Sequence, residues 1–157
     1  PTGSSTQTVI GYVDSLKEKS VYPESDIEAV SRAIESSTST GSVNEQQAVA
    51  WVLRNRAKKL ETTIKDMLCP GTTYGPRDSS RPFCSTQMKP SSRSTAIAKA
   101  ILQLPDNADP THGAIDFWLP DAQVAQNGLT VEEAREKLAE AGLKISGTIG
   151  RVELLHV

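Results

Sequence analysis

Glu35 is the residue whose type and position most directly suggest chemistry. The segment SRAIESSTSTG runs from an apolar helical pattern through Glu35 into six small residues, Ser36 to Gly41. A helix C-terminus carries partial negative charge, so a partly buried carboxyl there should have a raised pKa. Such a carboxyl can act as a general acid near neutral pH, and its neutralisation in Glu35→Gln should barely change stability or raise it slightly. The alternative, which position alone favours, is a solvated side chain at the helix edge.

Two further carboxylates could provide a second acid–base group. Asp109 precedes Pro110, which is typical of a turn, and Asp116 lies in an alternating, strand-like stretch. We therefore interpret both as structural and favour chemistry that needs one carboxyl group.

Metal and cofactor chemistry is not predicted. The chain has two histidines, His112 and His156, and no Cys or His pair at metal-ligand spacing. It also lacks a Gly-x-Ser-x-Gly elbow and a phosphate-binding loop. We expect neither a metal nor a cofactor.

Composition is that of an ordinary globular protein. The 157 residues suit one domain, and 37% hydrophobic and 23% charged residues are typical values. A net charge of −2 gives no reason to expect nucleic-acid binding. No stretch approaches the length needed to span a membrane, and the polar start PTGSSTQTV does not follow the plan of a signal peptide.

Cys69 and Cys84 bracket a stretch rich in Gly, Pro and Ser that has no helical or strand period. A disulfide there would close a loop of about fifteen residues if the compartment is oxidising. Two free thiols are the alternative.

Hydrophobic spacing predicts the first elements. Residues 6–19 have the pattern of an amphipathic helix, within an N-terminal extension that we place at residues 1–25. A capping box from Ser25 to Glu28 predicts a helix over residues 26–36, and a second, from Ser42 to Glu45, predicts a central helix over residues 44–60. Its buried stripe should comprise Ala48, Val49, Val52, Leu53, Arg56 and Leu60, with Trp51 interpreted as structural.

The second half of the sequence predicts shorter elements. They are a helical turn over 64–68, helices over 91–104, 120–128 and 130–141, and strands over 114–119 and 147–157 that pair antiparallel. Thr130 with Glu133 should cap the last helix, and Gly142 should end it. The predicted fold is a single helix-rich α+β domain with a central helix and a small antiparallel sheet.

Three segments in order carry a resemblance: AIESSTSTGSVNEQQAVAWVLRNRA, then PFCSTQ, then DPTHGAIDFWLPDAQ. Over residues 26–125 the chain resembles the cell wall hydrolase family that includes spore cortex-lytic enzymes. The matching pieces are the helix ending at Glu35, Gln46 to Arg56, Phe83 with Ser85, and Asp109 to Phe117. A longer segment between Glu35 and Gln46, and Cys84 at the position of the loop serine, depart from the family pattern.

The resemblance implies a lysozyme-like catalytic domain over residues 26–157 that cleaves the β-1,4 MurNAc–GlcNAc bond of peptidoglycan. Glu35 matches the family's essential glutamate, which favours a lytic transglycosylase with one acid–base carboxyl. Glu35 should then lie at the floor of the main cleft, with Thr111 across from it and the Phe83–Gln87 loop on one wall. Polar or flat groups near these motifs should bind the sugar: Ser85, Thr86, Gln87, Thr111, His112, Trp118 and Gln123. Trp118 could stack on a sugar ring or belong to the core.

Two other functions stay open. One is a hydrolytic muramidase with a second carboxylate, and the other is a non-catalytic glycan-binding or assembly module of a phage tail or secretion machine. In each case the expected partner is the peptidoglycan glycan strand. We expect a domain that is monomeric by itself or carried by a larger assembly. It should act in the periplasm or be delivered to the cell wall; if it is exported, its signal is missing from this sequence or it leaves by a route that needs none.

Overall fold

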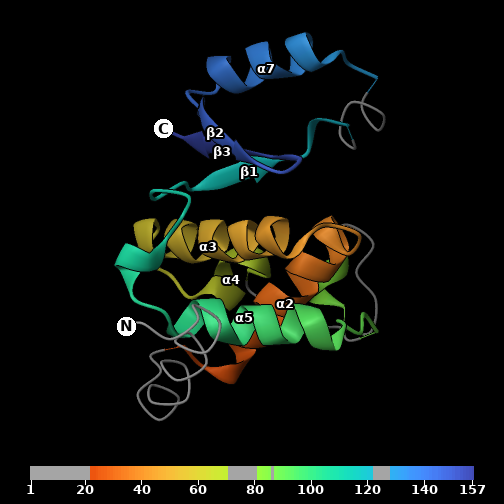
Figure 1. The fold of residues 1–157 in the computed structure, drawn as a ribbon, viewed down its shortest axis with the longest axis vertical. Helices are drawn as coiled ribbons and strands as arrows, with labels where there is room; N and C mark the ends of the chain where they lie inside the picture. Colours follow the sequence, from red (N-terminus) through yellow and green to blue (C-terminus); the bar gives the residue numbers. More distant parts are fainter. Residues whose placement is uncertain (1–21, 71–80, 86, 122–127) are drawn as a thin grey trace, which may run out of the picture.

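The computed structural model describes residues 22–70, 81–85, 87–121 and 128–157, which form an α+β fold as predicted. A helical body lies below a three-stranded antiparallel sheet, and one helix lies above the sheet (Figure 1). The body contains α2 (Glu24–Thr38), α3 (Val43–Lys59), α4 (Ile64–Leu68), η2 (Pro82–Cys84), α5 (Ser92–Gln103) and η3 (Asp106–Ala108). The upper part contains β1 (Asp116–Trp118), α7 (Val131–Glu140), β2 (Lys144–Ile149) and β3 (Val152–His156). The helix expected over 6–19 and most of the one expected over 120–128 lie outside the described residues.

Helix α2 begins earlier and ends later than expected. Its N-cap is Pro23, which makes no side-chain cap hydrogen bond, so the capping box predicted from Ser25 to Glu28 is wrong. The φ of −73° at Pro23 suits the extended residue before a helix. At the other end, the Ser37 and Thr38 hydroxyls donate to carbonyls one turn back, at 2.7 and 3.0 Å, which lets these small residues continue the helix.

Helix α3 is the central helix, and it packs on both sides. The predicted capping box between Ser42 and Glu45 is present. Val49 and Trp51 belong to the core of the helical body, whereas Ala48 and Val52 pack against the sheet. Trp51 is 1% exposed, which confirms its structural role. The expected burial of Arg56 and Leu60 is wrong, since both side chains are exposed and the buried cation is Arg54.

The sheet has the strand order β1–β3–β2. The predicted pairing of the 114–119 segment with the C-terminal segment is confirmed, because Phe117 pairs with Leu154. The single strand expected over 147–157 is instead a hairpin, since Gly150 turns the chain at a φ of +59°. Helix α7 has its predicted Thr130–Glu133 capping box and lies above the sheet without any buried residue of its own.

The described residues include no helix with both the length and the apolar character that crossing a bilayer requires.

Cys69 and Cys84 form a disulfide, which decides between the two alternatives left open by the sequence. Their Cα atoms lie 5.8 Å apart, and the two side chains are 1% and 3% exposed. The bond joins the end of α4 to η2, and η2 packs against α2. The disulfide therefore fixes the start of the segment that leads into α5.

Removing this disulfide should lower the free energy of unfolding by about 3 kcal/mol, the effect of closing a loop of roughly fifteen residues. The change is Cys69→Ala with Cys84→Ala, which leaves no buried thiol. Urea unfolding of this variant and the wild type, each with and without reductant, measures the effect. A wild type that loses no stability on reduction would contradict it, and the double variant should not respond to reductant.

Candidate functional site

Glu35 lies at the start of the last turn of α2, and its carboxylate contacts the N-terminus of α5. Its Oε1 accepts a hydrogen bond from the Ser91 backbone N–H at 2.7 Å and one from the Ser94 hydroxyl at 3.0 Å. Ser91 is the N-cap of α5, and its own hydroxyl oxygen accepts from the Ser94 N–H. The half-buried carboxylate therefore adds a second acceptor at the positive end of a neighbouring helix.

This contact lowers the pKa of Glu35, so the expectation of a raised pKa is wrong. The Ser91 backbone N–H has the largest effect, and it outweighs the partial burial of the carboxyl, which acts in the opposite direction. The Ser94 and Ser91 hydroxyls lower the pKa further. The physical reason is that the N-terminus of α5 contacts the carboxylate directly. The prediction took only the C-terminal end of α2 into account.

The expected tolerance of Glu35→Gln is corrected for the same reason. A neutral amide oxygen still accepts the Ser91 N–H, but the hydrogen bond is no longer charge-assisted. Loss of a helix cap of this kind costs about 1 kcal/mol. We therefore expect a small loss of stability at neutral pH rather than none.

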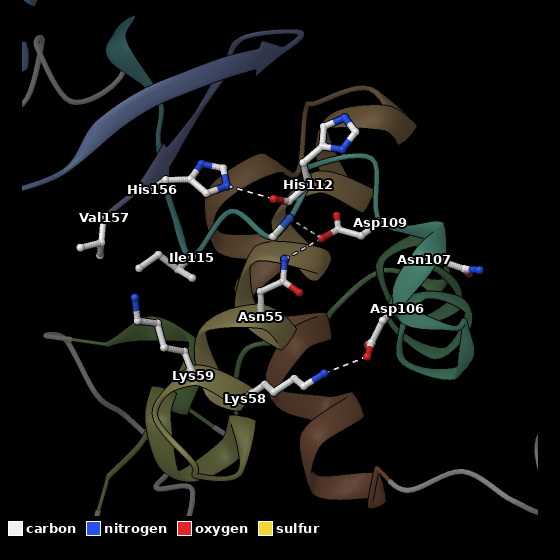
Figure 2. A pocket seen from close by; sticks show the side chains of 11 residues that line it. Asn55, Lys58, Lys59, Asp106, Asn107, Asp109, His112, Ile115, His156 and Val157 are labelled. Carbon is white, nitrogen blue, oxygen red and sulfur yellow. Dashed lines mark hydrogen bonds and ion pairs between the residues drawn. The ribbon is translucent and has the colours of Figure 1, made fainter.

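The pocket with the largest volume among those of the described residues lies elsewhere, and Glu35 does not line it. This pocket has a volume of about 640 Å³ and lies beyond the C-terminal end of α5 (Figure 2). The twelve residues of α5 separate it from Glu35 by about 18 Å along the helix. Its lining residues are Asn55, Lys58, Lys59, Asp106, Asn107, Asp109, His112, Gly113, Ile115, His156 and Val157.

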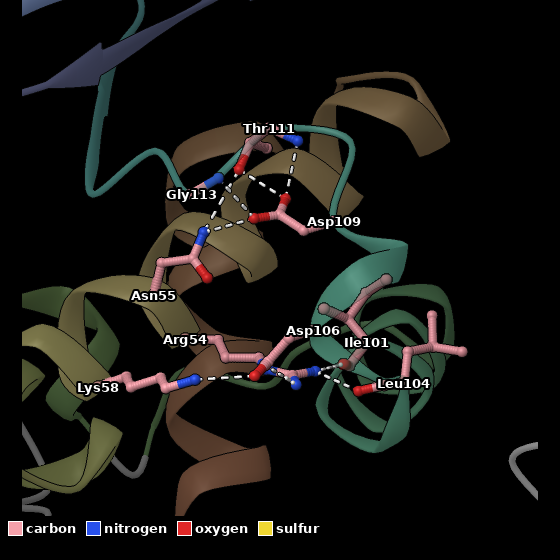
Figure 3. Close-up of polar contacts among 9 residues, drawn as sticks. All are labelled: Arg54, Asn55, Lys58, Ile101, Leu104, Asp106, Asp109, Thr111 and Gly113. Atoms are coloured by element: carbon pink, nitrogen blue, oxygen red, sulfur yellow. Dashed lines mark hydrogen bonds and ion pairs between the residues drawn. The ribbon is translucent and has the colours of Figure 1, made fainter.

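Asp109 organises one wall of this pocket (Figure 3). Its Oδ1 accepts from the backbone N–H and the hydroxyl of Thr111, at 2.7 and 2.6 Å. Its Oδ2 accepts from the Gly113 N–H at 2.9 Å and from the Asn55 amide at 2.8 Å. Burial would raise the pKa of Asp109, but these hydrogen bonds outweigh it and lower the pKa. Asp109 is thus engaged as a turn residue, as interpreted from the sequence.

Thr111 and His112 both belong to this loop and not to the surroundings of Glu35. Thr111 is 1% exposed, and its hydroxyl is bound to Asp109. His112 is exposed, lines the pocket and has a φ of +53°. Its carbonyl lies 3.1 Å from His156 Nε2, which holds the loop against β3. A left-handed residue other than glycine is uncommon and often marks a functional loop.

Trp118 belongs to the core. It is 5% exposed, and its Nε1 donates to the Glu153 carboxylate at 2.7 Å. Arg135 binds the same carboxylate and lowers the pKa of Glu153. The stacking of Trp118 on a sugar ring is therefore not available in this arrangement.

The predicted loop after Phe83 is described only in part. Ser85 is buried, and its hydroxyl oxygen accepts from the Gln87 N–H at 3.1 Å. Gln87 is exposed. Thr86 and Gln123 lie outside the described residues.

Sequence reasoning missed an ion pair between buried Glu45 on α3 and exposed Arg151 in the β2–β3 hairpin. Glu45 is 4% exposed and accepts from the Arg151 backbone N–H at 2.6 Å and from its Nε at 3.1 Å. A Cβ at Gly150 would lie 2.6 Å from Glu45 Cγ, so the close approach requires glycine. The capping box drew attention to Glu45, but nothing local in the sequence indicates Arg151 as its partner.

The described residues contain no group of three or more His, Cys, Asp or Glu side chains that could hold a metal ion.

Comparison of the chain with protein-family models, with curated proteins and with solved structures gives no match. The arrangement of the residues themselves is therefore the basis for a functional proposal.

Proposed function

We propose that this protein cleaves the glycan strands of peptidoglycan as a lytic transglycosylase, with Glu35 as its acid–base carboxyl. The observation that carries the proposal is that the second and third resembling segments each contact the helices α2 and α3, which hold the first. The Gln46 amide donates to the Thr38 carbonyl at 2.8 Å, which joins α3 to the end of the Glu35 helix. The Asn55 amide donates to the Ala114 carbonyl at 3.0 Å, and η2 packs against α2.

The reaction needs only one carboxyl group. Glu35 donates its proton to the leaving glycosidic oxygen and then accepts the proton of the muramic acid C6 hydroxyl as that oxygen attacks the anomeric carbon. A muramidase with a second carboxylate is less well supported, because Asp109 is held by four hydrogen bonds and Asp116 lies 3.8 Å from Arg56. The four hydrogen bonds engage both carboxylate oxygens of Asp109.

Electrostatics sets the condition under which Glu35 can act. In the free protein the Ser91 N–H favours the ionised carboxylate, so the acid form is scarce at neutral pH. A glycan bound over the exposed part of the carboxyl would raise the pKa of Glu35, because burial disfavours its charged form. The proposal therefore implies that cleavage is faster in mildly acidic solution.

Ser94→Ala should move the alkaline limb of the pH profile of kcat/KM to higher pH. The Ser94 hydroxyl stabilises the ionised Glu35, so its removal raises the pKa of that carboxyl and the fraction of protein in the acid form. The measurement is peptidoglycan clearance over a range of pH. Ser92→Ala, in the same first turn, is the matched control and should leave the limb in place. An unmoved or downward-shifted limb in Ser94→Ala would count against Glu35 as the acid.

A non-catalytic glycan-binding module is the second candidate, and a specific observation favours it. The hydrogen bonds of Glu35 hold α2 to α5, which is what a purely structural carboxylate would do. Mass spectrometry of digested peptidoglycan separates the candidates. Anhydro-muramic ends support transglycosylation, reducing ends indicate hydrolysis, and undigested strands that still bind the protein favour the module.

The disulfide supports a place of action outside the cytoplasm. Bonds of this kind form and persist in oxidising compartments, and peptidoglycan also lies outside the cytoplasm. The proposed site of action and the chemistry of Cys69 and Cys84 are therefore consistent.

A further inference from the structure

The side chains that line the pocket beyond the end of α5 include two cations, Lys58 and Lys59, and two anions, Asp106 and Asp109. Arg54 and Lys58 share the Asp106 carboxylate, at 2.7 and 2.8 Å, so two cations face one anion there. Lys59 also lines the pocket and makes no ion pair within the part of the chain that the structure describes. Lys58 is paired with Asp106, and Asp109 is engaged by four hydrogen bonds, which leaves Lys59 as the lining charge with no ionic partner among the described residues. Lys59 can therefore bind an anionic group in this pocket.

A hydrogen-bond acceptor lies beside that charge. The Asn55 amide nitrogen donates to Asp109 and to the Ala114 carbonyl, but Asn55 Oδ1 accepts no hydrogen bond from any described residue. Asn55 and Lys59 are four residues apart on α3, so they are neighbours on one helix face. A ligand that reaches Lys59 with an anionic oxygen can therefore offer an N–H to Asn55.

An apolar wall completes the pocket. Ile115 and Val157 line it on the same side as Lys59, opposite Asp106 and Asn107 (Figure 2). These side chains can contact a small apolar group but offer it no hydrogen bond. The pocket thus combines a cation, an acceptor and an apolar surface within reach of one small ligand.

We propose that this pocket binds the C-terminal end of a short peptide. The terminal carboxylate contacts Lys59, the last peptide N–H donates to Asn55 Oδ1, and a small side chain packs against Ile115 and Val157. A simple anion such as phosphate meets only the first of these requirements. The identification of the peptide as a peptidoglycan stem peptide rests on the proposed function. The proposal that the pocket binds a peptide C-terminus does not depend on that function.

The test is titration of the ¹⁵N-labelled protein with N-acetyl-D-alanyl-D-alanine, followed by NMR. We expect saturable binding with a Kd on the order of 1 mM, and shifts centred on the Asn55, Lys59 and Gly113 amides. Lys59→Gln should weaken binding by about tenfold, the effect of losing one charged contact. Lys99→Gln, an exposed lysine on α5, is the matched control and should bind like the wild type. Acetate and phosphate should bind more weakly than the dipeptide.

Three results would overturn the proposal: no saturable binding, equal binding by Lys59→Gln, or acetate binding as tightly as the dipeptide. The experiment does not depend on glycan cleavage, so the two proposals can fail separately. Peptidoglycan clearance without dipeptide binding would contradict the peptide site but support the lytic function. Dipeptide binding by a protein that clears no peptidoglycan would support the peptide site but contradict the lytic function.

Discussion

Glu35→Gln is expected to reduce peptidoglycan cleavage by about a hundredfold to ten-thousandfold, the typical effect of losing a general acid. The glutamine retains the shape of the side chain and can still accept the Ser91 N–H, but it has no proton to donate. The reduction should be at the upper end of this range if the same carboxyl also accepts the C6 hydroxyl proton. The measurement is turbidity clearance of purified peptidoglycan, alongside thermal unfolding of both proteins.

Glu28→Gln is the matched control for this experiment. Glu28 lies on the same helix, is exposed and pairs with Arg32 at 3.7 Å. Its substitution should leave clearance unchanged. If Glu35→Gln clears walls at the rate of the wild type while losing about 1 kcal/mol of stability, Glu35 is a structural link between α2 and α5. The non-catalytic module would then be the better interpretation.

The elements of this fold could be predicted where their signals are local. The capping boxes that begin at Ser42 and Thr130 could be predicted, because the two residues that bind the free N–H groups are three positions apart in the sequence. The same signal failed at Ser25, where Pro23 already sets the extended entry to α2. The hairpin in the C-terminal segment was not predicted, because its turn at Gly150 lies within an otherwise strand-like run of residues.

The candidate site could be predicted less well, because its contacts join distant parts of the chain. Glu35 and Ser91 are 56 positions apart, and no period or motif indicates that this serine's N–H would bind the carboxylate. The dipole of α2 alone favours a raised pKa at Glu35, whereas the Ser91 N–H at the N-terminus of α5 lowers it. Asp109 was interpreted correctly because its partners Thr111 and Gly113 are two and four residues away.

The interface between the helical body and the sheet depends on a carboxylate that is held in its ionised form. Glu45 accepts from Arg151 side-chain and backbone groups and from the Ser42 N–H, and the Arg151 side-chain hydrogen bond is the largest cause that lowers its pKa to about 2. An unperturbed glutamate has a pKa of 4.5. The contacts with Arg151 and Ser42 therefore stabilise the ionised form of Glu45 more than its protonated form.

The sign of the resulting pH dependence follows from that difference. Because the folded-state pKa lies below the unfolded one, the stabilisation is complete above pH 4.5 and is lost as the pH falls toward about 2. Arg151 is half exposed, so solvent reduces the effect. We expect Glu45→Gln to lower the free energy of unfolding at pH 7 by about 2 kcal/mol. The variant should also lose less stability than the wild type between pH 7 and pH 3.

Glu133→Gln is the matched control, because Glu133 occupies the same capping-box position in α7 but is fully exposed and pairs with no arginine among the described residues. Urea unfolding of the wild type and both variants at pH 7 and pH 3 measures the difference, and Arg151→Gln with the double variant isolates the pair. An equal loss of stability on acidification in Glu45→Gln and in the wild type would show that this carboxylate does not control the acid response. A strong coupling between positions 45 and 151 would instead identify the salt bridge as the contact that holds the hairpin on α3.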